Sequence, residues 1–338
     1  MQIWENISLR PYNTFRIEAA ARYFTAFQSV EELEEIMASR PYQDNASLVL
    51  GGGSNILLTR DVDGVVLKND IGGIAVVQED ENHIYLKAGA GVNWHKLVMF
   101  CVENSYAGAE NLSLIPGNVG ASPMQNIGAY GVEIKDVFYQ LEAYHLQEKA
   151  LQTFSLNDCE FGYRESIFKR KYKGQFVITS VTYRLNKKPV YHTSYGAIQQ
   201  ELERMGVQEL SIKAISNAVI SIRSSKLPDP KEVGNAGSFF KNPAVEKSHL
   251  ATIQQSYPDV PAFPLDEKFV KVPAGWLIEQ CGWKGHRRGD AGCYPKQALV
   301  LVNYGQATGN EIYALGEEIL QSVKSKFGIE LEREVNVI

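Results

Sequence analysis

Apolar residues recur at helical spacing in three stretches of the chain, which therefore predict three clear helices. The first follows Ser29, which has capping-box spacing to Glu32, and should end near Arg40-Pro41. The second follows Asn93 and carries its apolar face from Trp94 onwards. The third is expected to run from an Asn310 cap to Gly328.

Short aliphatic and β-branched runs predict strands between and after these helices, at residues 48–50, 64–68, 84–88, 176–185 and from Ile329 onwards. Leu48–Leu50 has the composition of a buried strand, whereas Phe176–Leu185 alternates and should be half-buried. Mixed short strands and separate helices indicate an α+β fold in two or three domains. Lys187-Lys188-Pro189 and Leu227-Pro228-Asp229-Pro230 mark the expected boundaries.

Composition excludes several classes of protein. With 44% hydrophobic and 22% charged residues, the 338-residue chain is neither disordered nor fibrous. A net charge of −5 argues against a nucleic-acid binder with a broad basic surface. Four cysteines without CxxC spacing and six histidines without HxxxH spacing leave a metal centre and a disulfide framework unsupported. With no leader pattern and no long apolar stretch, we expect a cytoplasmic protein that binds no membrane.

The segment Gly51-Gly52-Gly53-Ser54-Asn55 follows a predicted strand and could hold an anion. Main-chain N–H groups approach a phosphate closely only where no Cβ intervenes, and Ser54 and Asn55 add side-chain donors. A plain tight turn is an equally good interpretation of these five residues. The pattern is not G-x-G-x-x-G and leads towards another strand, so it fails the test for a Rossmann site. Gly89-Ala90-Gly91 fails as well, because Trp94 occupies the third glycine position.

The glycine-rich segment Ile115–Gly131, called here the 115–131 loop, follows neither a strand nor a helix period. Its polar side chains are amides and hydroxyls, and a loop of this kind can run its backbone along an extended ligand. An irregular surface loop would seldom carry so many large apolar residues. We therefore favour a cofactor-binding loop.

Three single residues are candidates for chemistry. Arg164 lies among aromatic residues, and its guanidinium can bind a carboxylate through two parallel hydrogen bonds, although a surface arginine is the commoner case. Ser238 lies between a glycine-rich approach and two phenylalanines, but most serines have no catalytic role. Glu334 lies on the expected terminal strand, where an exposed glutamate would be ordinary.

Taken together, these segments closely resemble the UDP-N-acetylenolpyruvoylglucosamine reductases, flavoenzymes of bacterial cell-wall precursor synthesis. The resemblance spans nearly the whole chain. It is carried by Pro11–Arg16, Gly51–Asn55, the 115–131 loop, Phe161–Lys169, Arg223–Pro230, Gly234–Pro243, Ala274–Glu279, Gln297–Leu301 and Glu332–Val335.

The resemblance implies an FAD-binding domain of the vanillyl-alcohol-oxidase type, followed by a smaller α+β substrate-binding domain. Its expected parts are an FAD-binding subdomain at residues 1–70, a second at 71–226, and the substrate domain at 227–338. Non-covalent FAD would be held by Gly51, Gly52, Gly53, Ser54, Asn55, Ile115, Pro116, Gly117, Gly120, Gln125, Asn126, Gly128, Tyr130 and Arg223. The substrate would be held by Tyr195 on a mobile tyrosine loop, Lys226, Asn242 and Gln297.

The resemblance also implies a mechanism. NADPH would reduce FAD, and flavin N5 would then deliver hydride to the vinyl C3 of the enolpyruvyl sugar nucleotide. Arg164 would neutralise the substrate carboxylate as charge develops, and Ser238 would give its proton to C2. Like charge and partial desolvation would favour the protonated form of Glu334, which could then donate a hydrogen bond. With no separate nicotinamide fingerprint, both substrates should visit one pocket in turn, with ping-pong kinetics.

Other expectations remain open. The chain ends soon after Glu334, so we expect that residue to be held less tightly than in longer members. We expect a monomer whose partners are small molecules. An FAD oxidase of the same domain type, or a non-catalytic protein that binds nucleotide sugars, are the alternatives. Covalent flavin attachment through histidine has no candidate in Gly51–Asn55 or in the 115–131 loop.

Overall fold

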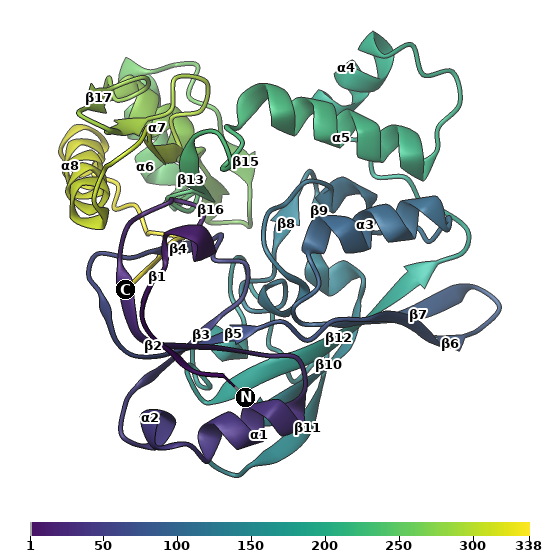
Figure 1. Cartoon of the computed structure of the whole chain (residues 1–338). Helices are drawn as coiled ribbons and strands as arrows, with labels where there is room; N and C mark the ends of the chain where they lie inside the picture. Colours follow the sequence, from purple (N-terminus) through teal and green to yellow (C-terminus); the bar gives the residue numbers. More distant parts are fainter. Residues whose placement is uncertain (1) are drawn as a thin grey trace. The chain divides into compact units, whose positions relative to one another are not determined.

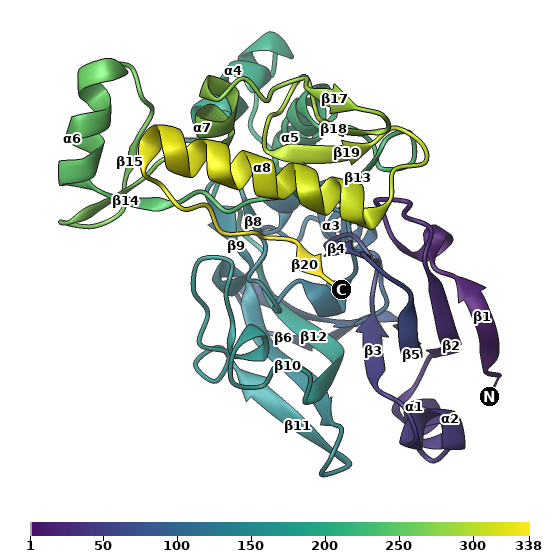
Figure 2. The same ribbon diagram turned by 90° about the vertical axis from the view of Figure 1, so that its left-hand side faces the viewer.

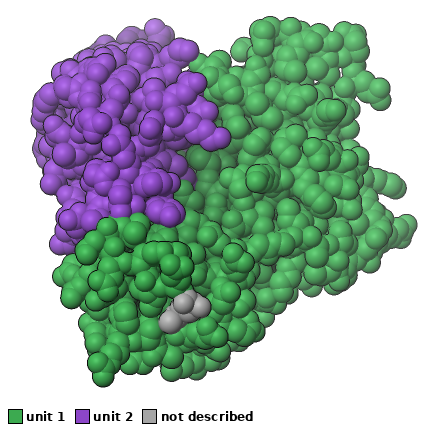
Figure 3. All heavy atoms as spheres, in the orientation of Figure 1, with its two compact units in different colours: residues 1–7, 21–52, 63–225 green, residues 8–20, 53–62, 226–338 purple. Residues whose placement is uncertain are grey.

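The computed structural model describes residues 2–338, which form two compact units. Figure 3 colours these units separately. Unit 1 comprises the described residues up to Ile7, with residues 21–52 and 63–225. Unit 2 comprises residues 8–20, 53–62 and 226–338. Two short N-terminal segments therefore pack with the C-terminal third of the chain rather than with their sequence neighbours.

The α+β class is confirmed, because helices and strands of both units are separate short elements (Figure 1). The α-helices are α1 (Val30–Met37), α2 (Arg40–Gln43), α3 (Trp94–Glu103), α4 (Gly196–Arg204), α5 (Ile212–Lys226), α6 (Lys247–Ser256), α7 (Ala274–Gln280) and α8 (Gly309–Phe327). Short 3-10 turns are η1 (Arg10–Tyr12), η2 (Glu110–Leu112), η3 (Val119–Ala121), η4 (Ile134–Asp136) and η5 (Ile167–Lys169).

The strands are short, and only four of those described are eight residues or longer. They are β1 (Trp4–Ser8), β2 (Ala20–Phe27), β3 (Ser47–Leu50), β4 (Ile56–Leu57), β5 (Val62–Asn69), β6 (Ile74–Glu79), β7 (His83–Gly89), β8 (Gly128–Ala129), β9 (Val132–Glu133), β10 (Phe138–His145), β11 (Ala150–Ser155), β12 (Phe176–Asn186), β13 (Gly234–Ser238), β14 (Ala244–Glu246), β15 (Phe263–Pro264), β16 (Phe269–Lys271), β17 (Arg287–Arg288), β18 (Ala291–Cys293), β19 (Val300–Asn303) and β20 (Asn336–Val337).

Side-chain caps start the predicted helices. The Ser29 hydroxyl accepts the Glu32 N–H, and the Asn93 side chain accepts the Lys96 N–H, so both predicted starts are confirmed. Helix α1 ends at Met37, and the Arg40-Pro41 pair begins α2, where proline fits the first turn.

The start of α8 differs from the prediction. Thr308, not Asn310, is its cap, and Thr308 and Glu311 form a reciprocal capping box. The predicted end of α8 is confirmed, because Gly328 adopts φ 66°.

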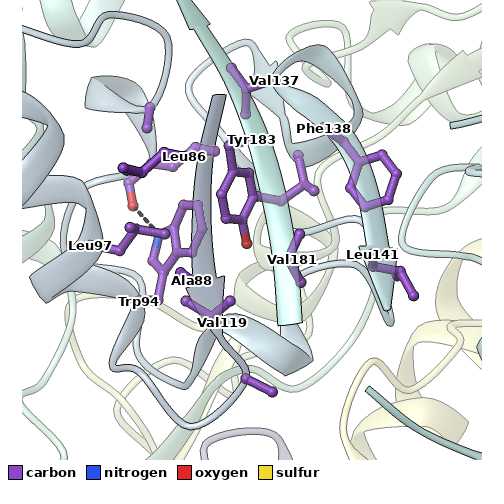
Figure 4. Packing of buried hydrophobic residues seen from close by; sticks show 14 of the residues in the cluster. Leu86, Ala88, Trp94, Leu97, Val119, Val137, Phe138, Leu141, Val181 and Tyr183 are labelled. Carbon is purple, nitrogen blue, oxygen red and sulfur yellow. Dashed lines mark hydrogen bonds between the residues drawn. The ribbon is translucent and has the colours of Figure 1, made fainter. Parts of the chain in front are cut away.

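Unit 1 is built on an antiparallel five-stranded sheet with the order β11-β10-β12-β7-β6. The prediction of a half-buried strand at 176–185 is wrong, because β12 is central and most of its residues are buried on both faces. One face packs against α3 and η3: the rings of Trp94 and Tyr183 meet edge to face at 5.7 Å (Figure 4). The Trp94 Nε1–H donates to the Leu112 carbonyl at 2.9 Å, as Figure 4 also shows.

A second sheet in unit 1 has the order β1-β2-β5-β3, with β3 parallel to β5. Packed with it is an apolar cluster that includes Phe27, Leu33, Val65 and Tyr144. Strand β3 is an edge strand, and Val49 is exposed, so the prediction of a fully buried strand at 48–50 is wrong.

Unit 2 contains a four-stranded sheet with the order β13-β19-β18-β17, against which α8 packs (Figure 2). The predicted terminal strand is much shorter than expected. Residues after Ile329 are irregular apart from one bridge, Phe240 to Arg333, and β20 is limited to Asn336–Val337, which pairs in parallel with β4. No helix within residues 2–338 combines the length and apolar content needed to span a membrane.

Candidate functional site

The first two glycines of the Gly51–Asn55 motif lie in unit 1, directly after β3. A Cβ built on Gly52 would lie 3.0 Å from the Gly117 Cα, so two glycine-rich segments meet main chain to main chain. Gly51 is more open, since its Cβ would meet only the Asn118 Cβ at 3.9 Å. The structure therefore brings together the motif and the 115–131 loop, which the sequence placed far apart.

Gly53 begins the part of the motif that belongs to unit 2. It adopts φ +60°, and a Cβ there would lie 1.9 Å from the Tyr12 carbonyl oxygen. The Thr14 N–H and hydroxyl both donate to the Gly53 carbonyl, at 3.0 and 3.3 Å. Only glycine fits this position, and it packs against the Pro11–Arg16 segment.

Asn55 makes contacts that its predicted role did not include. Its side-chain amide donates to the Glu334 carbonyl at 3.2 Å, and its own carbonyl accepts both the N–H and the side-chain amide of Asn336. Ser54 lies between it and Gly53. The last residue of the motif therefore ties the segment that carries Glu334 to the glycine turn.

The 115–131 loop is anchored along its length in unit 1. The Gly120 N–H donates to the Ala90 carbonyl, and a Cβ on Gly120 would lie 2.7 Å from the Ala90 Cβ. The Ser122 hydroxyl bonds to that of Tyr183 at 2.8 Å. Ile115 packs against the core, Gln125 is half-buried and Pro116 is exposed.

Gly89-Ala90-Gly91 has a structural role that its sequence pattern did not predict. A Cβ on Gly89 would lie 2.3 Å from the Gly72 carbonyl oxygen, and one on Gly91 would lie 2.6 Å from the main chain of Asp70. The triplet therefore lets residues 70–72 cross close to its main chain, while Gly120 of the 115–131 loop packs against Ala90. Three consecutive small residues after a strand are the signal that points to such a crossing.

Arg164 lies at a tight turn in unit 1. Gly162 and Glu165 exchange main-chain hydrogen bonds, and Arg164 between them adopts φ +54°. Its Nη2 donates to the Gly128 carbonyl at 2.7 Å, and its guanidinium carbon lies 5.3 Å from the Tyr163 ring centroid. Arg164 is one of nine described non-glycine residues with a positive φ, so the geometry of its side chain, rather than its backbone conformation, makes it a candidate.

Asn126 positions that turn. This buried side chain donates to the Gly162 carbonyl at 3.0 Å and to the Glu133 carboxylate at 3.1 Å, while its Oδ1 accepts the Lys135 N–H. Both ends of the amide therefore engage the protein. Asn126 connects the 115–131 loop to the main chain beside Arg164.

Arg223, on α5, provides a second guanidinium in unit 1. Its Nε donates to the Leu114 carbonyl at 3.2 Å, and burial lowers its pKa from the usual value, as does the nearby charge of Arg164, while Tyr130 opposes the shift. Burial, and then the charge of Arg223, also lower the pKa of His95, which accepts the Leu114 N–H. Two neighbouring guanidiniums in unit 1 favour an anionic ligand.

Ser238 and Glu334 lie on adjacent chain segments of unit 2. Ser238 ends β13 directly after Gly237, which adopts φ +71°, and the Phe239 N–H donates to the Leu299 carbonyl. The Glu334 N–H donates to the Phe239 carbonyl at 2.9 Å. With Asn55 on its other side, the Glu334 segment is hydrogen-bonded on both sides.

The predicted substrate residues fall in both units. In unit 2, the Asn242 Oδ1 accepts the Ala274 N–H at the start of α7, and Gln297 lies close to Gly275 in the same helix, so these two side chains share one helix end. Lys226 is exposed at the end of α5. Tyr195, in unit 1, is half exposed, and its ring meets Tyr130 edge to face at 5.4 Å.

Comparison with known proteins identifies the relatives of this chain. Residues 21–148 match an FAD binding domain, and residues 229–338 match the C-terminal domain of UDP-N-acetylenolpyruvoylglucosamine reductase. The enzymes of that name from Flavobacterium johnsoniae and Amoebophilus asiaticus are each 51% identical to this chain over the full length of both chains. The chain belongs to the UDP-N-acetylenolpyruvoylglucosamine reductase family.

Solved structures support the same fold. The UDP-N-acetylenolpyruvylglucosamine reductase of Thermus caldophilus superposes with a TM-score of 0.70 at 24% identity, covering 100% of this chain and 99% of the other. A p-cresol methylhydroxylase gives a TM-score of 0.50 at 11% identity, covering 98% and 84%. The predicted fold, an FAD-binding domain followed by the family's C-terminal domain, is confirmed.

Family membership makes this protein an FAD-dependent oxidoreductase. The residues present fit that cofactor: Gly51 and Gly52 add no side chain of their own where the motif meets the 115–131 loop, and Arg223 supplies positive charge in unit 1. The individual FAD contacts named from the sequence remain predictions.

Proposed function

We propose that this protein reduces UDP-N-acetylenolpyruvoylglucosamine to UDP-N-acetylmuramate with NADPH, in the synthesis of peptidoglycan precursors. The observation that carries this proposal is full-length similarity to reductases of that name, at 51% identity, together with Arg164, Ser238 and Glu334 at the three positions expected to be catalytic.

FAD, when bound, supplies the electrons that saturate the substrate double bond. Gly51, Gly52, the 115–131 loop and Arg223 in unit 1, with Gly53, Ser54 and Asn55 in unit 2, would hold it without a covalent bond. We propose that the rest of the chain binds both substrates, stabilises the negative charge that develops on the sugar nucleotide and donates a proton to it.

Arg164 is proposed to bind the carboxylate of the enolpyruvyl group. The bond to Gly128 and the contact with Tyr163 hold the guanidinium in place before substrate arrives. A fixed positive charge stabilises negative charge as it develops on the substrate, which is commonly the largest catalytic contribution.

Ser238 is proposed to donate a proton to C2 of the substrate, and Glu334 to donate a hydrogen bond to the same developing charge. Main-chain hydrogen bonds hold both residues. The N–H of Phe239, which follows Ser238, donates to the Leu299 carbonyl, and the Glu334 N–H donates to the Phe239 carbonyl. A general acid held in this way contributes roughly 10²- to 10⁴-fold in rate.

The sugar nucleotide is proposed to contact Tyr195, Lys226, Asn242 and Gln297. NADPH would occupy the same pocket before it, so the kinetics should be ping-pong, with parallel double-reciprocal plots. We further propose a cytoplasmic monomer, with an FAD-binding part at 1–70 and 71–226 and a substrate domain at 227–338.

An anaerobic two-step experiment tests the proposal. NADPH should bleach the yellow protein, and added UDP-N-acetylenolpyruvoylglucosamine should restore the flavin absorbance. Restoration by oxygen alone, with no response to the sugar nucleotide, would instead favour an oxidase of the same domain type. A colourless protein that binds the nucleotide sugar would favour a non-catalytic role.

A further inference from the structure

The segment between β12 and α4 leads directly into Tyr195. At one end, the Lys187 N–H donates to the Asn82 carbonyl. At the other end, Tyr195 is the N-cap residue of α4, and its main-chain carbonyl accepts the Ile198 N–H. Across residues 188–194, as the structure describes them, one hydrogen bond connects the segment to the rest of unit 1. It comes from the side chain of Asn111.

Asn111, in η2, is almost fully buried and holds two segments at once. Its side-chain amide donates to the His192 carbonyl at 2.8 Å and to the Tyr130 carbonyl at 3.0 Å. Both N–H groups are therefore used, and both acceptors are main-chain oxygens, which fixes the orientation of the amide.

The two segments that Asn111 joins are the ones whose rings meet. Tyr130 belongs to the 115–131 loop, and its ring contacts Tyr195 at a centroid distance of 5.4 Å. Tyr130 also packs against the apolar cluster of α4 and α5. Fixing the main chains of residues 130 and 192 together therefore limits how far Tyr195 can move from Tyr130.

We propose that Asn111 is a positioning residue that latches residues 188–194 to the 115–131 loop and so sets the location of Tyr195. The effect on substrate binding rests on the proposed function, in which Tyr195 contacts the sugar nucleotide. Asn111 itself touches no reacting atom; it acts through the main chains of His192 and Tyr130.

The chemistry of the contact explains why an asparagine is needed. Two carbonyl oxygens face the side chain, so the residue there has to present two donors, which aspartate, of almost the same size, does not. Nearby, Glu110 accepts the Gly108 N–H, and burial raises the pKa of its carboxyl. An additional carboxylate at position 111 would therefore be doubly unfavourable.

Limited proteolysis of the FAD-bound protein tests the latch directly. Chymotrypsin should cleave after the exposed Tyr191 or Tyr195 at least several times faster in Asn111→Asp and in Asn111→Leu than in the native protein. Asn104→Asp is the matched control, because Asn104 donates a comparable bond to the Phe100 carbonyl at the exposed end of α3. That variant should be cleaved at the native rate.

Steady-state kinetics test the link to substrate. KM for the sugar nucleotide should rise about 5- to 30-fold in Asn111→Asp, the loss expected for one or two buried hydrogen bonds, with kcat changed less than KM. Bound FAD should stay at the native content, which separates this effect from misfolding. If Asn111→Asp fails to retain FAD, Asn111→Leu, which adds no charge, takes its place.

The outcomes separate the two proposals. Native cleavage rates in both FAD-bound variants would overturn the latch, and faster cleavage with an unchanged KM would overturn its role in positioning Tyr195. If the native protein does not turn over the sugar nucleotide, the proposed function fails. The cleavage rates then still decide whether Asn111 holds the segment.

Discussion

Arg164 and Ser238 are held in their positions by different means. The turn that carries Arg164 is closed by main-chain bonds between Gly162 and Glu165, and a buried side chain ties it to its surroundings, because Asn126 bonds to the Gly162 carbonyl and to Glu133. The chain around Ser238 is held mainly by main-chain pairing, through the Phe239 N–H to Leu299 and the Glu334 N–H to Phe239, with one side-chain bond from the Gly237 N–H to the buried Asn235. The first arrangement is vulnerable to side-chain substitution; the second is vulnerable mainly to changes that move the backbone.

This difference predicts which substitutions remove only a catalytic group and which also disrupt the structure that holds it. Truncating Ser238 leaves every main-chain bond around it in place. Truncating or recharging Asn126 leaves buried partners without donors, which costs more than the bond itself contributes.

Ser238→Ala should have the largest effect, because it removes the proposed proton donor from an intact scaffold. Reoxidation of reduced flavin by the sugar nucleotide should slow by roughly 10²- to 10⁴-fold, equivalent to about 3–5.5 kcal/mol. Flavin reduction by NADPH should persist. Stopped-flow absorbance measures each half-reaction separately, and equal slowing of both would assign Ser238 a structural or binding role.

Gly53→Ala should break the main-chain arrangement of unit 2. The new Cβ would lie 1.9 Å from the Tyr12 carbonyl oxygen, at a φ of +60°. Overpacking and left-handed strain together should lower the free energy of unfolding by about 2–5 kcal/mol in urea denaturation.

Gly237→Ala is the matched control for that substitution. Gly237 has a similar φ of +71°, but no atom lies within 4 Å of its added Cβ. Its loss of stability should be about 1–2 kcal/mol. Equal losses at the two positions would show that strain, rather than contact with Tyr12, limits residue 53.

Asn126→Asp should weaken unit 1 without adding volume. Two donors are replaced by a carboxylate that faces the Gly162 carbonyl and the Glu133 carboxylate, so we expect a loss of about 2–3 kcal/mol. Because the Arg164 turn loosens, activity should fall even in variant protein that stays folded. Unchanged turnover in folded, FAD-bound Asn126→Asp would show that the turn is held by other contacts.

Much of the local structure was predictable because its signals are local. Asn93 and Lys96 are three residues apart, and their cap started α3 where the sequence placed it. The burial of β12 was not predictable, because alternation within one strand does not reveal that α3 and η3 cover its second face.

The sequence supplied the candidate residues of the site but not the hydrogen bonds that connect them. Composition and family resemblance pointed to Asn55 and Asn126 as cofactor ligands. The structure shows each of them bonded to chain segments distant in sequence. Asn111 has no motif of its own, since its role exists only because folding brings residues 130 and 192 together.

Glu110→Gln should give the smallest change in the free energy of unfolding. It tests whether unit 1 contains buried polar groups that lower its stability. One Glu110 carboxyl oxygen is buried without a hydrogen-bond partner among the described residues, and burial raises the pKa of the group. The folded protein therefore binds this proton more tightly than the unfolded chain, so the native protein is favoured at low pH. Stability falls as pH rises from the unfolded pKa through the folded one.

The glutamine variant lacks this titration, so it should match the native protein at acidic pH and exceed it by about 1 kcal/mol at alkaline pH. Thermal unfolding across that pH range provides the measurement, with Glu103→Gln, at an exposed carboxylate ending α3, as the control substitution. A Glu110→Gln variant that is less stable at every pH would show that the carboxylate is instead well compensated, by the Gly108 N–H and the nearby His192. Burial of the Glu110 carboxyl would then cost unit 1 no free energy of folding. Asn126 alone would remain as the buried side chain that distinguishes unit 1 from the main-chain pairing around Ser238.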